Sequence, residues 1–214
     1  MAIKPILFNT EMVRAILDGR KTVTRRLVKF LSRKNPNWTG YVKNGLMLYN
    51  GRNEPCIKKA PYHTGDILYV RETWCGLPVN EAGHFRGHPI YYYRADGDLR
   101  PEGWRGAWHP SIHMPKEAAR IWLKAMNVRV ERLQDITPKD AENEGVGNLF
   151  YEDIGYSEKN YGTEVDKEYG IAREQFVWLW ESTIKKSELD RYGWKANPWV
   201  WVIEFERCDK PEGR

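Results

Sequence analysis

The chain of 214 residues has little cysteine and no long apolar run. Its three cysteines, Cys56, Cys75 and Cys208, are too few and too widely spaced for a disulfide framework or a CxxC pair. We therefore expect reduced thiols in a cytoplasmic protein. No segment of about eighteen apolar residues occurs, and the opening segment MAIKPILFNTEM has no long apolar stretch, so we expect neither a membrane span nor a signal peptide.

The common catalytic and cofactor motifs are also missing. The sequence contains no GxxxxGK[ST] or GxGxxG phosphate loop, no GxSxG nucleophile elbow and no HExxH zinc motif. Two histidine pairs, His84 with His88 and His109 with His113, have the i, i+4 spacing of zinc ligands on a helix, but glycine and proline neighbours disfavour a helix there. The sequence thus predicts no metal site and no cofactor.

What is present suits one globular domain with a substantial core. Of the residues, 41% are hydrophobic and 29% are charged, and 10 Trp, 12 Tyr and 6 Phe can be buried. The expected elements alternate irregularly, and the strands follow one another too closely for βαβ units. We therefore predict an α+β fold, a small and mostly antiparallel barrel or sheet with peripheral helices. The expected strands lie at 4–8, 67–72, 90–93, 120–123, 128–133 and 199–206, a hairpin lies at 41–49, and a helix lies near 172–185.

Positive charge is concentrated at the start of the sequence. Residues 1–34 hold nine basic and two acidic residues, a local charge of +7, whereas the whole chain carries +5. A local basic surface suits an anionic partner such as nucleic acid or a nucleotide. The alternative is an ordinary solvated surface.

A short helix leads into this basic segment. Asn9 or Thr10 can cap it, and Gly19 can take the left-handed position that ends it. The threonines and valine that follow favour an extended segment, in which alternate side chains face opposite sides. Thr24 then lies on one face and Lys21 on the other unless a twist or bulge brings them together.

A second short helix carries two acidic candidates. Thr137 is the expected N-cap, Pro138 the first helical residue and Gly145 the stop signal. Glu142 and Glu144 lie on different faces of such a helix.

Lysine, threonine and glutamate of this kind can catalyse acyl transfer. The hydroxyl of Thr24 is a workable nucleophile if burial lowers the pKa of Lys21, and the carboxylic acid of Glu144 can protonate a leaving nitrogen. Spacing alone favours the non-catalytic interpretation, in which Lys21 and Arg26 are surface cations, Thr24 is an ordinary strand residue and Glu144 is a solvated helix residue. Trp74, which follows a strand, can stack on a nucleobase or belong to the core. Glu72 can form an ion pair with Arg71 or another basic side chain.

Residues 19–26, GRKTVTRR, resemble the GxKxxxxR signature of the ASCH superfamily, whose fold is a PUA-like β-barrel. Residues 5–22, 65–74 and 197–202 are similar to the larger ASCH proteins of phages and prophages. The resemblance implies one PUA-like domain over residues 1–214. The segments that it marks as insertions lie near 33–62, 76–117 and 147–170.

The resemblance also implies an activity and its residues. Some bacterial ASCH proteins are amidohydrolases that remove the acyl group from N4-acetylcytidine, with a lysine, a threonine three residues later and a downstream glutamate. These correspond to Lys21, Thr24 and Glu144, with Glu142 as the near alternative for the acid. The further substrate-binding residues are then Arg26, Glu72 and Trp74. The expected partner is a small nucleoside, with no cofactor, membrane or obligate protein partner.

Two other functions share the same basic segment. PUA-like domains commonly bind RNA, in which case Lys21 and Arg26 would contact phosphate and Trp74 or a tyrosine would stack on a nucleobase. A ribonuclease, also known in the superfamily, is the third alternative.

Overall fold

The computed structural model describes residues 1–31, 41–43, 46–50, 52–76, 91–100, 102, 106–146 and 164–212, with side chains of the helix that begins at Glu164 described from Ala172 onward. The chain divides into two compact units, each described by itself. The first unit comprises Met1–Asp18, Gly65–Lys124 and Glu206–Arg214, and the second comprises Gly19–Thr64 and Ala125–Phe205. Within the described ranges, no helix is both long and apolar enough to cross a membrane.

The structure is of the α+β class with a mostly antiparallel sheet. Five strands follow the order β1-β5-β8-β9-β2, and β3-β4 and β6-β7 form two-stranded sheets. The β1–β5 pair is parallel, whereas the β5–β8 and β2–β9 pairs are antiparallel. Closure of the sheet into a barrel stays a prediction. The strands are β1 (Ile3–Leu7), β2 (Val23–Leu27), β3 (Tyr41–Lys43), β4 (Met47–Tyr49), β5 (Ile67–Arg71), β6 (Trp74–Gly76), β7 (Tyr91–Tyr93), β8 (Trp122–Arg132) and β9 (Trp199–Cys208).

The helices of the described chain are mostly short. The α-helices are α1 (Thr10–Leu17), α2 (Pro138–Asn143), α3 (Glu164–Ser182) and α4 (Leu189–Tyr192). The 3-10 turns are η1 (Arg94–Asp96), η2 (Ser111–His113), η3 (Lys116–Ala118), η4 (Leu133–Asp135), η6 (Lys186–Glu188) and η7 (Trp194–Ala196).

In the first unit, local sequence signals determine α1. Asn9 is the N-cap and its side chain accepts the backbone N–H of Met12 at 2.9 Å. Val13 and Ile16 are buried on one face of the helix. The predicted helix is confirmed, including the positive φ of 75° at Gly19, just beyond its end.

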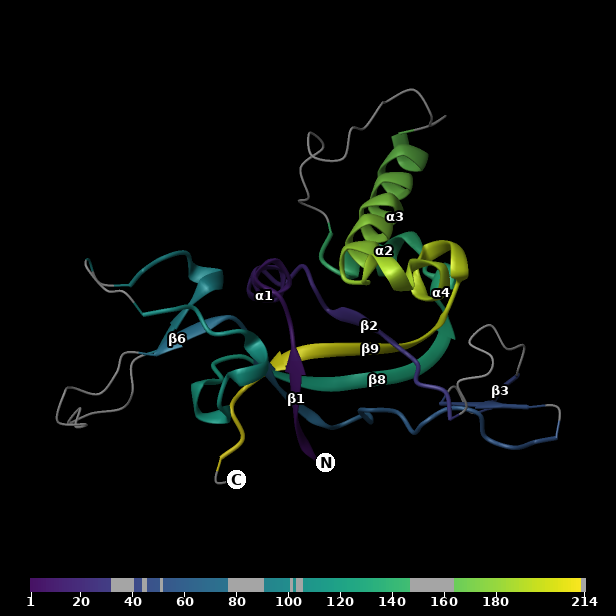
Figure 1. Ribbon diagram of the computed structural model, residues 1–214, viewed down its shortest axis with the longest axis horizontal. Helices are drawn as coiled ribbons and strands as arrows, with labels where there is room; N and C mark the ends of the chain where they lie inside the picture. Colours follow the sequence, from purple (N-terminus) through teal and green to yellow (C-terminus); the bar gives the residue numbers. More distant parts are fainter. Residues whose placement is uncertain are drawn as a thin grey trace. The chain divides into compact units, whose positions relative to one another are not determined.

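In the second unit, β9 provides the central packing surface. Trp201 and Ile203 on one face and Val200 and Val202 on the other are all buried. Such burial on both faces is typical of an interior strand, and β9 lies between β8 and β2 in the strand order. Figure 1 shows β8 and β9 running side by side and α2 lying against α3.

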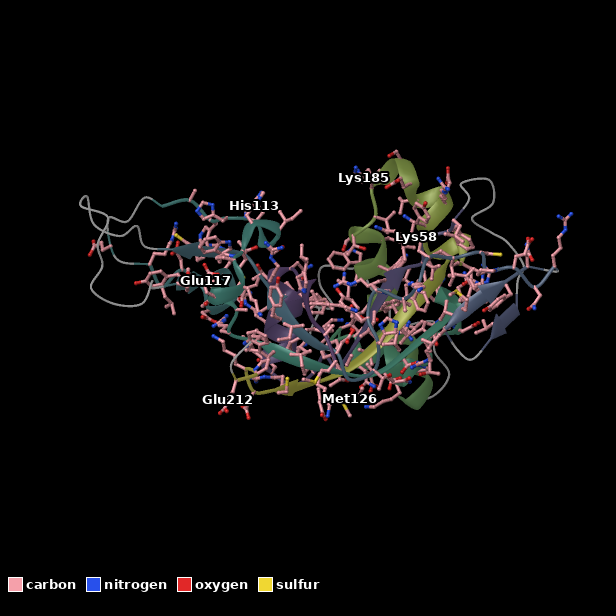
Figure 2. All side chains as sticks on the ribbon, turned by 90° about the horizontal axis from the view of Figure 1, so that it is seen from below. Lys58, His113, Glu117, Met126, Lys185 and Glu212 are labelled. Atoms are coloured by element: carbon pink, nitrogen blue, oxygen red, sulfur yellow. The ribbon has the colours of Figure 1, made fainter. Side chains whose placement is uncertain are left out.

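Two parts of the structure differ from the sequence-based expectation. The strands expected at 120–123 and 128–133 belong mostly to one long strand, β8, which continues through Met126 and Asn127 although both are exposed in succession. Met126 points outward from this strand (Figure 2). The acidic, Tyr- and Gly-rich composition of residues 147–170 favours a loop, which is wrong for the described part, because α3 begins at Glu164. The remainder, 147–163, lies outside the described residues.

Candidate active site

Helix α2 presents Glu144 at its C-terminal end. The Thr137 hydroxyl accepts the backbone N–H of Asp140 at 3.1 Å, which starts the helix, and Pro138 occupies its first position. Glu144 is the C-cap, and Gly145 follows with a φ of 87°. The short helix therefore has both of its predicted boundaries, and they determine where the glutamate lies.

Backbone hydrogen bonds connect this helix end to the segment that leads into β2. Lys21 and Glu144 form an antiparallel bridge. Next to it, the Thr22 N–H donates to the Asn143 carbonyl at 2.8 Å, and the Thr22 carbonyl accepts the N–H of Phe205 in β9 at 2.8 Å. Residues 123 positions apart in the sequence thus come into register.

The side chains of Lys21 and Glu144 form a buried ion pair. Lys21 Nζ lies 2.6 Å from Glu144 Oε2, 2.9 Å from the Glu144 carbonyl and 2.8 Å from the Val23 carbonyl. The two residues are 2% and 4% exposed. Three acceptors match the three N–H groups of an ammonium. Glu142, the alternative acid, instead pairs with Lys139 at the surface.

Burial shifts the proton affinity of Lys21 in the direction that a general base needs. Desolvation lowers the pKa of Lys21, the Glu144 carboxylate opposes this change, and the charges of Arg26 and Arg25 lower the pKa further. The net direction is downward. Burial also lowers the pKa of Arg26, against the opposing influence of Tyr62 and Glu144.

Arg25 extends the ion pair into a network. Its Nη1 lies 3.2 Å from Glu144 Oε1, and its Nη2 lies 2.8 Å from Glu131 Oε1 and 3.2 Å from Asp140 Oδ2. Arg129 bonds to the same Glu131 carboxylate at 3.1 Å and also pairs with Glu204. The side chains become more exposed from the Lys21 end of this network to the Glu204 end.

Thr24 is buried in β2, opposite Ile203 of β9. Strand alternation points its side chain away from the face that Arg25 uses. In the part of the chain that the structure describes, the Thr24 hydroxyl has no hydrogen-bond partner. The structure therefore brings Lys21 and Glu144 into contact, with Thr24 nearby in the sequence but not bonded to either.

Glu72 belongs to the first unit, where an arginine holds both of its oxygens. Arg120 Nε and Nη2 each lie 3.0 Å from one carboxylate oxygen, and Arg120 also pairs with Asp96 at 2.6 Å. Burial raises the pKa of Glu72, although Arg120 opposes this change. The Arg120 guanidinium lies 4.0 Å from the Tyr93 ring centre, and burial raises the pKa of Tyr93 to about 12.

Trp74, in β6 of the same unit, packs against other aromatic rings. It meets Tyr91 edge-on at 5.7 Å and lies tilted over His109 at 5.0 Å. Its buried Nε1 has no hydrogen-bond partner among the described residues. The ring therefore contributes to local packing, and its proposed role in stacking on a base stays a prediction.

The histidine pairs do not form a metal site in the described structure. Trp74 exchanges backbone hydrogen bonds with His109, whereas His113 lies in η2, so these two histidines do not share an α-helix. His84 and His88 lie outside the described residues. Across the described ranges, no three His, Cys, Asp or Glu residues form a group that could hold a metal ion.

Sequence reasoning missed Arg25, Glu131 and Asp140 as neighbours of the candidate site. A signal was present for two of them. Asp140 lies four residues before Glu144 on α2, and Arg25 shares the strand face expected for Lys21. No local pattern paired these two segments, and the resemblance placed only Lys21 and Glu144 in a common site.

Comparisons with known proteins add one structural likeness. No family model matches the chain, and no curated protein matches it. A solved structure described as a high-resolution crystal structure of an ASCH domain from Lactobacillus crispatus JV V101 is similar with a TM-score of 0.36 and 11% sequence identity. The match covers 96% of this chain and 79% of that chain.

Proposed function

We propose that this chain is an ASCH-superfamily amidohydrolase that removes acyl groups from N4-acylated cytidine nucleosides. Thr24 is the nucleophile, Lys21 its base and Glu144 the acid. The observation that carries the proposal is the buried Lys21–Glu144 pair, joined at 2.6 Å, in which Lys21 lies three residues before Thr24 in the sequence. Membership of the superfamily rests on the GRKTVTRR segment and is part of the proposal.

The pair can supply the starting state of such a reaction by moving one proton. Transfer from Lys21 Nζ to Glu144 Oε2 gives a neutral amine and a carboxylic acid. The amine still donates to its two carbonyl partners, and its lone pair accepts from the new carboxylic O–H. Because burial lowers the pKa of Lys21, the neutral pair costs less than it would in water.

The reaction then proceeds in two balanced stages. Glu144 turns toward the substrate nitrogen with its proton, which frees the lone pair of Lys21 to take the proton of the Thr24 hydroxyl. The Thr24 oxygen attacks the amide carbonyl, and Glu144 protonates the departing N4 nitrogen, leaving an acyl ester on Thr24. Water then attacks the ester, giving its proton to Glu144, and Lys21 returns its proton to Thr24.

Arg26 is assigned to stabilise the negative oxygen that forms during each attack. It lies two residues after Thr24 in β2, on the strand face expected for Thr24, and remains a cation at neutral pH because arginine titrates far above this range. Glu72 and Trp74 receive no step, because Arg120 engages both Glu72 oxygens and Trp74 packs against neighbouring rings. Their assignment to substrate binding stays a prediction.

The test is hydrolysis of free N4-acetylcytidine by the wild type and by three variants, Lys21→Met, Thr24→Ala and Glu144→Gln. Loss of the nucleophile is expected to reduce kcat by about a thousandfold or more, and loss of the acid by about 100- to 10,000-fold. Thr22→Ala is the matched control, two residues from Thr24 on a partly exposed site, and is expected to stay within about twofold of the wild type.

Two results would overturn the assignment. Undiminished hydrolysis by the Thr24→Ala protein would remove Thr24 as the nucleophile. Salt-dependent RNA binding by a wild type that hydrolyses no N4-acylcytidine would favour the RNA-binding alternative, and release of nucleotides from RNA would favour a ribonuclease.

A further inference from the structure

Arg25 is a buried cation that the proposed mechanism does not use. Its side chain has 0% exposure and lies among three carboxylates that come from two different elements. Glu131 comes from β8, whereas Asp140 and Glu144 come from α2 and its C-cap. Arg25 therefore links the strand of the proposed nucleophile to the helix of the proposed acid.

The contact of Arg25 with Glu144 has a specific geometry. Arg25 Nη1 lies 3.2 Å from Oε1, whereas Lys21 Nζ lies 2.6 Å from Oε2. We propose that Arg25 is a positioning residue, which holds Oε1 of Glu144 so that Oε2 is presented to Lys21. This inference rests on the proposed function, because it assumes that Glu144 is the acid.

Arg25 is itself held firmly enough to act in this way. Nη2 lies 2.8 Å from Glu131 and 3.2 Å from Asp140, and the guanidinium carbon lies 5.7 Å from the Phe176 ring centre. A planar guanidinium fixed by two carboxylates on one nitrogen presents its other nitrogen in a defined direction. Glu144 can then turn about the held Oε1 while Oε2 changes its partner from Lys21 to the substrate.

The terminal nitrogens of Arg25, and not its Nε, make the contacts with the carboxylates. Its buried Nε has no hydrogen-bond partner among the described residues. An unpaired buried donor costs stability. The two terminal nitrogens nevertheless contact all three carboxylates, including the proposed acid.

Arg25 also affects Lys21 through space. The groups that influence the ammonium of Lys21 are Glu144 at the end of α2, which raises its pKa, and Arg26 and Arg25 of β2, which lower it. Removing the Arg25 charge therefore raises the pKa of Lys21. Because Lys21 and Glu144 share one proton in the starting state, loss of that proton to solvent at high pH stops the reaction. The alkaline limb of the pH–rate profile is therefore expected to move to higher pH.

The experiment compares Arg25→Gln and Arg25→Lys with the wild type. Arg129→Gln is the matched control, because Arg129 bonds to the same Glu131 carboxylate and does not contact Glu144. We expect Arg25→Gln to reduce kcat by up to about 100-fold with KM within about threefold, and Arg25→Lys to restore part of the loss. The control is expected to keep the pH profile of the wild type.

A second measurement does not depend on catalysis. The Lys21 resonance of protein labelled at lysine 13Cε is titrated by NMR, with assignment from Lys21→Met, in the wild type, Arg25→Gln and Arg129→Gln. An upward pKa shift confined to Arg25→Gln supports the inference even if no substrate is hydrolysed, in which case only the proposed function fails. An unchanged Lys21 pKa, or an equal shift in both variants, overturns it.

A second set of variants serves if Arg25→Gln does not fold. Arg25→Gln leaves the buried Glu144 carboxylate near the half-buried carboxylates of Glu131 and Asp140. If that protein does not fold, the double variant Arg25→Gln/Asp140→Asn removes one of those charges and is measured against Asp140→Asn alone. The same outcomes in kcat and in the Lys21 titration then support or overturn the inference.

Discussion

A buried lysine beside a buried carboxylate can serve folding as well as catalysis, and at Lys21 the two roles make separate predictions. Lys21 donates to two backbone carbonyls as well as to Glu144. Replacing it removes all three hydrogen bonds and leaves Glu144 buried with Arg25 as its remaining cation partner among the described residues.

We predict that Lys21→Met lowers the free energy of unfolding by about 3–5 kcal/mol, the usual cost of breaking a buried ion pair. Urea unfolding monitored by tryptophan fluorescence measures it. Lys139→Met is the control. Lys139 pairs with Glu142 on the exposed face of α2, and such a pair stabilises the helix by about 0.2–0.5 kcal/mol. Equal losses in the two variants would contradict the buried geometry described for Lys21.

At the scale of elements, the cap of α2 connects stability to the proposed chemistry. Thr137→Ala removes the side-chain acceptor for the Asp140 N–H and is expected to cost about 1 kcal/mol. Because Glu144 is the C-cap of this six-residue helix, fraying of α2 also displaces the proposed acid, and turnover should fall. Urea unfolding and N4-acetylcytidine hydrolysis are measured on the same preparation.

The cap of α1 provides the comparison for that prediction. Asn9 accepts the Met12 N–H at 2.9 Å, and Asn9→Ala removes a bond of the same kind in the first unit. The stability loss should be similar, about 1 kcal/mol, with turnover unchanged. A parallel fall in turnover for both variants would mean that general destabilisation, not the position of Glu144, limits the reaction.

The two caps also show which elements the sequence could predict. Asn9 with Gly19 and Thr137 with Gly145 were recognisable because capping depends on residues close together in the chain. The continuity of β8 through Met126 depends on sheet pairing, so local alternation placed a break there. The start of α3 at Glu164 had no comparable punctuation, and its apolar residues were recognised only from Phe176 onward.

The candidate site divides in the same way. The positions of Lys21 and Glu144 were predicted from resemblance, and the structure shows their contact. The role of Arg25 required contacts with residues 106 to 119 positions away, which no local pattern encodes. Glu72 was a candidate on sequence grounds. Its bidentate partner Arg120 lies 48 positions later in the sequence, so no local pattern could predict their contact.

At the scale of the whole molecule, the structure gives a different interpretation of the positive charge in the first 34 residues. The sequence placed nine basic residues there, which suggested a surface for an anionic partner. Several of them bond to acceptors within the fold, whereas Lys29 is exposed. The residues with such internal bonds are Lys4, Arg14, Arg20, Lys21 and Arg25. A large part of the local charge therefore takes part in bonds within the fold.

This distribution predicts how the protein responds to RNA. If all nine basic residues contacted phosphate, the logarithm of the binding constant would fall with the logarithm of salt concentration with a slope of about −6, at about −0.7 per contact. Because five of them are bonded internally and Arg26 interacts with Tyr62 and Glu144, we expect a slope of about −2 or smaller in magnitude from this segment. Fluorescence anisotropy of a labelled single-stranded RNA across a salt series measures the slope.

Two lysine variants test which residues contribute to this slope. Lys29→Gln should reduce its magnitude by up to about 0.7, whereas Lys4→Gln, at a residue paired with Asp66, should leave it unchanged. A slope near −6 that decreases equally in both variants would restore the basic segment as an RNA-binding surface.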